Sequence, residues 1–504
     1  MITRSAAAYK SNGRAGVDHL LDLGPNQIFL LLMLSVSAGL ILSIVLADGD
    51  IWVAIACGLF VAIFVHLCLL ADRYVAFPGF ISFVASIELL LAPVVASKFP
   101  PTTYEFRMAV PLDTYLQYAT PATAALWIGL HWPLYHLLLP STSESSQPTP
   151  LFPRQRKWLD IVLVVSVFLN SFANDSPAQF FFLVTILGSL GFFAALCWML
   201  TRTPGWQFRV AIVMLQLVAT ASAAGIFYVV VQWSGFFLLA YGFRSRWRSR
   251  LALMLILATV GAGILQYVKS DYRHYIGTRD AGFIERVSAL GRMVWNKTTM
   301  EDEQFDQTRF GDVLVRFDQG WIISRIMRVV PRKVPYAEGA TIKDALMFTL
   351  LPRVLFPDKP EGASRILFAR FTGLQLDPHT TMGLTIPGEM YANFGYWGGV
   401  LATFVFGSLV GLAYKQFAKL SRRSPHWWAA VPVVLLAAIE PAWNVEDISN
   451  YIVKSALVLF LFASSVPALR ELLALRPLGI WKRKERARSI GMLNKQTGFD
   501  PRRT

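Results

Sequence analysis

The sequence predicts an all-α protein that crosses a membrane many times. Of its 504 residues, 55% are hydrophobic and only 16% are charged, and the mean hydropathy is +0.47. A soluble domain carries about 25% charged residues. The apolar residues also gather into runs of about 20, the length that a helix needs to cross the hydrocarbon core of a bilayer. Together these features exclude an ordinary soluble enzyme and a disordered protein.

Twelve apolar runs have a length suited to a membrane span. One apolar stretch, 208–243, is too long for a single straight span, and we divide it at the small residues Ala221 to Gly225. We place the spans near 27–47, 51–70, 77–97, 113–137, 158–173, 178–200, 208–223, 226–243, 250–268, 390–414, 427–443 and 449–466.

The basic residues predict the orientation of these spans. Lysine and arginine gather in the leader, in the tail and in alternate short loops, whereas the opposite short loops hold only Lys98 and Arg107. Because basic loops stay in the cytoplasm, we expect both termini there, and the net charge of +15 indicates this sidedness and not a nucleic-acid partner. The predicted parts are a cytoplasmic leader (1–26), spans one to nine (27–268), a large periplasmic loop (269–386), spans ten to twelve (387–466) and a basic cytoplasmic tail (467–504).

The large loop is rich in arginine. Guanidinium groups bind phosphate through two parallel hydrogen bonds and keep their charge when partly desolvated. This chemistry suits a lipid-linked phosphate or pyrophosphate, although surface ion pairs would also explain the composition. We predict helices around Arg325–Val330 and Ile342–Phe348, the second lying at the membrane surface. The arginines are Arg309, Arg316, Arg325, Arg328, Arg332, Arg353, Arg365 and Arg370.

Two stretches of the loop carry the candidate site. Prolines flank Arg353 and follow Lys359, so that a preorganised segment would hold two cations toward one anion. Further on, His379 titrates near neutral pH and is a candidate general base. Glu389 shares a helix face with Asn393, four residues on, and is either a second candidate base or a stabiliser of the first helical turn.

Polar residues inside the spans must face a cavity or a partner, because an ionisable group is costly at membrane depth. Glu88 is the best candidate for a carboxylate that lines a cavity, and we expect Glu440 to pair with Lys454. The three cysteines all lie in apolar runs, without the spacing of a disulfide framework or a metal site, and we predict no metal and no cofactor. The other polar residues within spans are Asn170, Gln216 and Gln232.

The long loop, the segment from Leu351 to Pro360 and the helix entry from Gly388 to Gly399 resemble the Wzy-type polymerases of oligosaccharide repeat units, within the O-antigen polymerase and ligase superfamily. In sequence, the resemblance covers about residues 310–415, and elsewhere it lies only in the layout of spans. It implies a fold like that of the GT-C glycosyltransferases. The spacing after His379 departs from the histidine pattern of the ligases, which favours a polymerase.

The resemblance implies a metal-independent glycosyl transferase of the bacterial inner membrane. Its partners would be the membrane and an oligosaccharide on undecaprenyl pyrophosphate, with a chain-length regulator as a further candidate. Arg316, Arg325, Arg353 and Lys359 would bind the pyrophosphate, and His379 or Glu389 would act as the base. Substrate contacts would come from Tyr391, Asn393 and Trp397. The alternatives are O-antigen ligase chemistry and a polytopic transporter or flippase of lipid-linked oligosaccharide.

Overall fold

The computed structural model describes residues 25–47, 49–71, 74–135, 151–172, 176, 178–225, 227–245, 248–278, 282–299, 307–350, 363–376, 380, 382–440 and 442–475. In this part of the chain all regular structure is helical, which confirms the predicted all-α class. The elements are α1 (Pro25–Ala47), α2 (Ile51–Leu70), α3 (Phe77–Ser86), η1 (Ile87–Leu91), α4 (Ala92–Lys98), η2 (Tyr104–Phe106), α5 (Leu112–His131), η3 (Trp132–Leu134), α6 (Pro153–Ser171), α7 (Ala178–Leu200), α8 (Trp206–Ala224), α9 (Tyr228–Ser245), α10 (Arg248–Thr278), α11 (Phe283–Thr299), α12 (Gln307–Leu314), α13 (Gly320–Val329), α14 (Ala340–Leu350), α15 (Ala363–Thr372), α16 (Ile386–Ser421), α17 (Trp427–Leu435), η4 (Leu436–Ile439), α18 (Val445–Ser465) and α19 (Pro467–Leu472).

The chain is a multi-pass membrane protein. Within the described residues, eight helices are long and apolar enough to cross a bilayer, and α9 and the α17–η4 run are shorter apolar helices. Each of the twelve predicted spans overlaps with one helix or one run of helices, although 113–137 and 427–443 extend beyond the helical residues described. The division of the stretch 208–243 is confirmed, because α8 ends before Gly225, which has a left-handed backbone. The count of twelve crossings stays a prediction.

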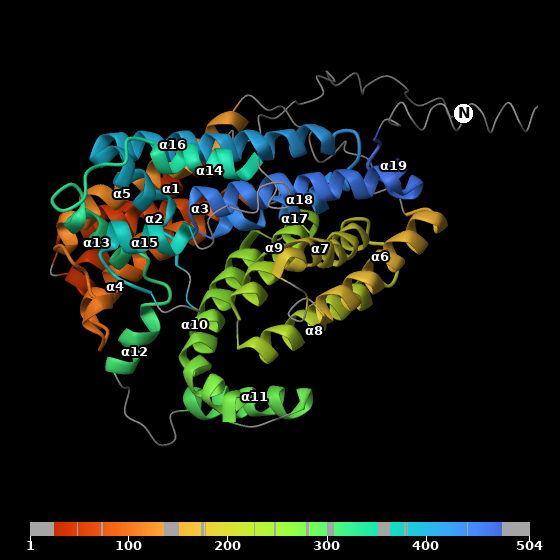
Figure 1. Cartoon of the computed structure of the whole chain (residues 1–504), viewed down its shortest axis with the longest axis horizontal. Coiled ribbons are helices and arrows are strands. Elements are labelled where there is room, and N and C mark those ends of the chain that lie inside the picture. Colours follow the sequence, from red (N-terminus) through yellow and green to blue (C-terminus); the bar gives the residue numbers. More distant parts are fainter. Residues whose placement is uncertain are drawn as a thin grey trace, which may run out of the picture.

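Two groups of helices meet at α17 (Figure 1). One group contains α2, α3, α5, α16 and α18, and the other contains α6 to α10. The central helix α17 packs against α16 and α18 on one side and against α7 on the other. Its residues from Trp427 to Leu435 are all buried, so the apolar core is continuous across both groups.

Glycine residues let α5 and α16 cross with their backbones in contact. A Cβ atom on Gly129 would clash with the carbonyl oxygen of Phe404, and one on Gly411 would clash with that of Leu130. Small residues permit such close crossings in membranes, where dispersion contacts rather than the hydrophobic effect hold helices together. The crossing fixes α16 against the bundle for much of its length.

A proline, Pro93, disturbs the third span near its end. Pro93 has no N–H, so the carbonyl of Leu89, four residues earlier, has no helical donor. The hydroxyl of Tyr115 on α5 donates to that carbonyl at 2.7 Å. The missing main-chain bond is thereby replaced by a contact between two spans.

The turn before this proline is a π-helical turn, η1. The N–H of Ala92 donates to the carbonyl of Ile87, five residues earlier. The carbonyl of Glu88, which Ala92 would reach in an α-helix, is therefore free for another donor. The N–H of Gln319, far away in sequence, donates to it at 3.1 Å. This bond attaches the segment between α12 and α13 to the membrane bundle.

Five helices, α11 to α15, lie in the long segment between α10 and α16. Helices α13 and α14 confirm the two helices predicted there, although the membrane-surface position of α14 stays a prediction; in the structure α14 packs along α18. A separate small core, with Trp321, Phe368 and Phe371 at its centre, joins α13 and α15 to the beginning of α16. The proline-rich stretch 351–360 lies outside the described residues.

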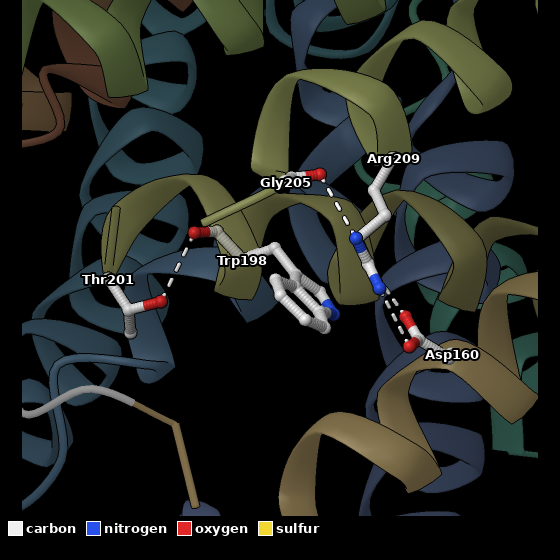
Figure 2. A network of polar contacts seen from close by, with 5 residues as sticks. All are labelled: Asp160, Trp198, Thr201, Gly205 and Arg209. Atoms are coloured by element: carbon white, nitrogen blue, oxygen red, sulfur yellow. Dashed lines mark hydrogen bonds and ion pairs between the residues drawn. The ribbon is translucent and has the colours of Figure 1, made fainter. Parts of the chain in front are cut away.

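The helices α6, α7 and α8 are joined by polar contacts (Figure 2). The guanidinium of Arg209 makes two bonds to the carboxylate of Asp160, at 2.7 and 2.9 Å, and its carbon lies 3.6 Å from the ring centroid of Trp198. Asn170 and Gln216, two of the polar residues predicted to face a partner, donate to backbone carbonyls of neighbouring helices. Polar groups in these spans therefore hold helices together.

Helix α16 is interrupted at Gly395, where φ is 70° and ψ is −156°. This conformation is essentially restricted to glycine. The interruption releases the carbonyls of Ala392 and Asn393, which accept the N–H groups of Ala337 at 3.0 Å and Glu338 at 3.1 Å. The long segment is thus attached to the bundle at a second irregular helical turn.

We predict that Gly395→Ala lowers the free energy of unfolding by about 1–3 kcal/mol, because alanine is strained at this φ and ψ. Its Cβ would also lie 3.1 Å from the ring of Tyr336. The measurement is thermal unfolding of the purified protein in detergent. Gly261→Ala in α10 is the control, because its Cβ meets nothing within 4 Å. Equal unfolding temperatures for the two variants would contradict the prediction.

Candidate functional site

Several chain segments meet at one end of the bundle, which we call the loop side: the end where α10 finishes at Thr278 and α16 begins at Ile386. There Arg273 of α10 donates from Nε to the carbonyl of Gly225, at 3.2 Å. The N–H of Val445, at the start of α18, donates to Glu389 of α16 at 2.8 Å. The loop side therefore unites helix ends that are far apart in sequence.

Three cations form a cluster on the loop side, which we call the cation cluster: Lys269, Arg273 and Arg316. Lys269 and Arg273 are four residues apart on α10, and Arg316 lies in the turn after α12. Arg316 interacts electrostatically with both of the others. Burial lowers the pKa of the Arg316 guanidinium, and the nearby charge of Arg273 lowers it further.

Among the described residues, no neighbour neutralises the positive charge of this cluster. Lys269 is only 8% exposed, whereas Arg273 and Arg316 are exposed. In the part of the chain that the structure describes, no carboxylate forms an ion pair or hydrogen bond with any of the three. Like charges gathered in a partly desolvated place are unfavourable unless an anion joins them. The arrangement is therefore suited to binding a multiply charged anion such as a diphosphate.

Two carboxyl groups within the bundle form a second group, which we call the carboxyl pair: Glu88 on η1 and Glu440 after η4. They are close enough to interact electrostatically, and the hydroxyl of Tyr228 interacts with both. Glu88 is 6% exposed, and its Oε2 atom has no hydrogen-bond partner. A small apolar cavity between α3, α5 and α16 opens beside Glu440.

Glu440 was expected to pair with Lys454, and its contacts in the structure are different. The carboxyl of Glu440 accepts a hydrogen bond from the side chain of Trp443 and lies near Asp447. The ammonium of Lys454 lies 4.8 Å from the ring centroid of Phe182. Glu440 therefore interacts with Glu88 and faces the small cavity. This agrees with the expectation that an ionisable residue within a span faces a cavity or a partner.

Asp318 is a further buried carboxyl, two residues after Arg316 and only 3% exposed. Its Oδ1 accepts the N–H of Gly320 at 2.7 Å, which stabilises the start of α13. Burial raises the pKa of Asp318 to about 7, against the opposing effect of the backbone donors of Gly320 and Trp321. The carboxyl thus titrates near neutral pH.

We predict that Asp318→Asn removes a pH dependence of stability. The pKa of Asp318 is raised from 3.8 to about 7 by folding, so the stability from this group is complete below about pH 4 and is lost as the pH rises to 7. The variant should unfold at the same temperature as the wild type near pH 4 and at a higher temperature at pH 8. Thermal unfolding across this range checks the prediction, and a constant difference would contradict it.

Glu389 and Asn393 lie on one face of α16, as their spacing predicted, and both are buried. One carboxylate oxygen of Glu389 accepts the hydroxyl of Thr341 at 2.7 Å, and the other accepts the N–H of Val445 at 2.8 Å. The carboxylate therefore links α14, α16 and α18. Of the two roles that the sequence left open, these contacts favour stabilisation, and a role as base stays an untested prediction.

The side chain of Asn393 is also fully used within the protein. Its oxygen accepts the N–H of Gly339 at 3.0 Å, and its nitrogen donates to Thr341 and to the carbonyl of Glu389, both at 2.8 Å. Asn393 therefore fixes the turn before α14, and in this arrangement it has no polar atom left for a substrate. Its assignment to substrate binding has no support in the geometry.

We predict that Glu389→Gln and Thr341→Val each lower the free energy of unfolding, because each leaves a buried donor or acceptor without its partner. A loss of about 1–3 kcal/mol is typical of such a defect. Thermal unfolding in detergent is the measurement. Thr349→Val is the matched control, since the hydroxyl of this buried threonine on α14 bonds only to Ala345 of its own helix. An unchanged unfolding temperature for both variants would refute the linking role.

Arg325 and Tyr391, two other predicted site residues that the structure describes, make contacts elsewhere. Arg325 donates from Nε to the carbonyl of Glu105 at 2.7 Å, and burial, together with the charge of Arg328, lowers its pKa. Among the described residues, no contact joins it to Arg316. Tyr391 is partly buried against Tyr118, with ring centroids 4.9 Å apart.

Trp397 is 75% exposed on the surface of α16, where only its contact with Tyr396 is seen in the described part of the chain. Three predicted site residues, Arg353, Lys359 and His379, lie outside the described residues. Their assigned roles stay predictions. No three His, Cys, Asp or Glu residues come together in the described residues as metal ligands would.

Sequence reasoning missed Lys269 and Arg273, because it ended the ninth span at 268. The helix continues for ten residues to Thr278, and the ring of Tyr272 is buried there beside Phe227. A signal was present: two basic residues four apart, directly after an apolar run, share one helix face. Asp318 was also missed, since nothing in its local sequence shows that it is buried.

Comparison with known protein families, with curated proteins and with solved structures finds no match to this chain. Fold and site together define its class as an α-helical multi-pass membrane protein with a cluster of cations on the loop side and buried carboxyl groups in its bundle.

Proposed function

We propose that the protein is a metal-independent glycosyl transferase of the bacterial inner membrane. It would polymerise oligosaccharide repeat units carried on undecaprenyl pyrophosphate, with the loop side facing the periplasm and both termini in the cytoplasm. The growing glycan on one carrier lipid is transferred to a sugar hydroxyl of a second lipid-linked unit. The carrier diphosphate is the leaving group.

The cation cluster carries this proposal. Lys269 is buried, Arg273 and Arg316 are exposed beside it, and within the described part of the chain none of the three has a carboxylate partner. The departing diphosphate develops negative charge in the transition state, and preorganised cations stabilise such charge strongly where water is limited. A lipid-linked diphosphate also suits a site at the end of membrane-spanning helices, because its tail would lie in the bilayer.

The cellular test is the analysis of carrier-lipid glycans in a strain that lacks the protein. A polymerase defect leaves single repeat units on the carrier at the periplasmic face, with no polymer. Single units retained in the cytoplasm would instead identify a flippase. Long chains that remain on the carrier would identify a ligase.

We predict that Arg316→Ala reduces polymerisation at least tenfold, because hydrogen bonds to charged groups each contribute about 1.5–3 kcal/mol. Arg316→Lys should restore only part of the activity, since one ammonium cannot make the paired bonds of a guanidinium. The measurement is turnover of extracted lipid-linked repeat units by the purified protein. Arg292→Ala is the control, because it removes the same charge from an equally exposed position on α11 that does not belong to the cation cluster. Equal losses in the two alanine variants would contradict a specific role for Arg316.

A further inference from the structure

The carboxyl pair is joined to the cation cluster by two short links. Gln319, whose N–H bonds to the carbonyl of Glu88, is three residues after Arg316. Tyr228, whose hydroxyl faces both carboxyls, is three residues after Gly225, to which Arg273 bonds. Three residues of chain span at most about 11 Å. The carboxyl pair and the cation cluster are therefore connected through short stretches of the same two segments.

The polar groups around the carboxyl pair are incompletely satisfied. Among the described residues, Glu88 Oε2 is buried without a hydrogen-bond partner, whereas the hydroxyl of Tyr228 interacts with the side chain of Gln232. Gln319 is 9% exposed, and its Oε1 likewise has no partner. Leaving a buried acceptor unpaired is costly, and native proteins rarely do so without a functional reason. Two such acceptors, on η1 and in the turn before α13, point to a missing donor, such as a sugar hydroxyl.

We propose that Glu88 is the general base that accepts the proton of the attacking sugar hydroxyl. This inference rests on the proposed function and adds a catalytic residue to it. The hydroxyl oxygen forms a bond to the anomeric carbon of the donor glycan. The bond between that carbon and the diphosphate oxygen breaks, and its electron pair leaves with the carrier diphosphate. The hydroxyl proton passes to Glu88 Oε2.

Other carboxyls on the loop side are less suited to this step. Both oxygens of Glu389 are occupied by Thr341 and Val445. Asp318 accepts backbone N–H groups of α13. Glu440 already accepts a hydrogen bond from Trp443. Glu88 combines a free oxygen with a π-helical turn, a feature frequent at functional sites.

The irregular turn also explains how Glu88 is positioned. Since Pro93 and the π turn fix the backbone through bonds to Tyr115 and Gln319, the side chain of Glu88 is carried on a braced segment. A base held in place in this way is ready for proton transfer without rearrangement. Removal of a positioned general base typically costs about 10²- to 10⁴-fold in rate.

The test uses Glu88→Gln, which keeps the size of the side chain and removes its ability to accept the proton. Turnover of lipid-linked repeat units, extracted from a strain lacking the protein, should fall at least 100-fold. Binding of undecaprenyl pyrophosphate should stay within twofold of the wild type, because the cation cluster is intact. Ser86→Ala is the matched control: this buried hydroxyl on the same span bonds only to Phe83 of its own helix. Its turnover should be unchanged.

Turnover of Glu88→Gln within a few-fold of the wild type would overturn the inference. If that variant does not fold, Glu88→Asp keeps a carboxyl but withdraws it by one methylene. Its turnover should fall at unchanged carrier binding, and wild-type turnover would equally overturn the inference. Failure of the proposed function looks different, because the wild-type protein itself would then neither bind undecaprenyl pyrophosphate nor make polymer.

Discussion

Main-chain carbonyls released by two irregular helical turns hold the long segment on the membrane bundle. At η1 the carbonyl of Glu88 is left without its helical donor and accepts Gln319. At Gly395 the carbonyls of Ala392 and Asn393 are released and accept the chain just before α14. A buried carbonyl must find a donor, so each irregularity in a span creates a specific attachment point. The positions of Arg316 and of the turn before α14 both depend on these bonds.

The two attachment points have different consequences for the site. The one at Glu88 places Arg316 beside α10, where Lys269 and Arg273 complete the cation cluster. The one at Gly395 is reinforced by Glu389 and Asn393, whose polar atoms are all taken up by α14 and α18. Among the described residues, the region around Glu88 thus has cations without a carboxylate partner and oxygens without a hydrogen-bond donor. In the region around Gly395, the side chains of Glu389 and Asn393 all have hydrogen-bond partners. This contrast separates residues suited to chemistry from residues that hold the helices together.

Much of the fold follows from the sequence, because hydrophobic runs of spanning length have few other solutions. Ile51–Leu70 was predicted to the residue, and the left-handed Gly225 ends α8 where the small residues indicated. The end of α10 was missed, since its last turns are polar and depend on a tertiary contact of Tyr272. For the site, the shared face of Glu389 and Asn393 was predictable from spacing. Their partners Thr341 and Val445 were not, because distant contacts leave no local pattern.

Attachment through carbonyl oxygens also affects what mutagenesis can detect. Replacing Gln319 or Glu338 by alanine leaves the main-chain N–H intact, and residue 337 is alanine already, so a conventional alanine scan does not detect these attachment points. Only substitutions that remove the main-chain N–H, such as proline or an ester linkage in place of the amide, would break these hydrogen bonds. For the same reason, side chains around these joints are free to diverge while the architecture persists, and relatives with the same layout need share little of the sequence printed here.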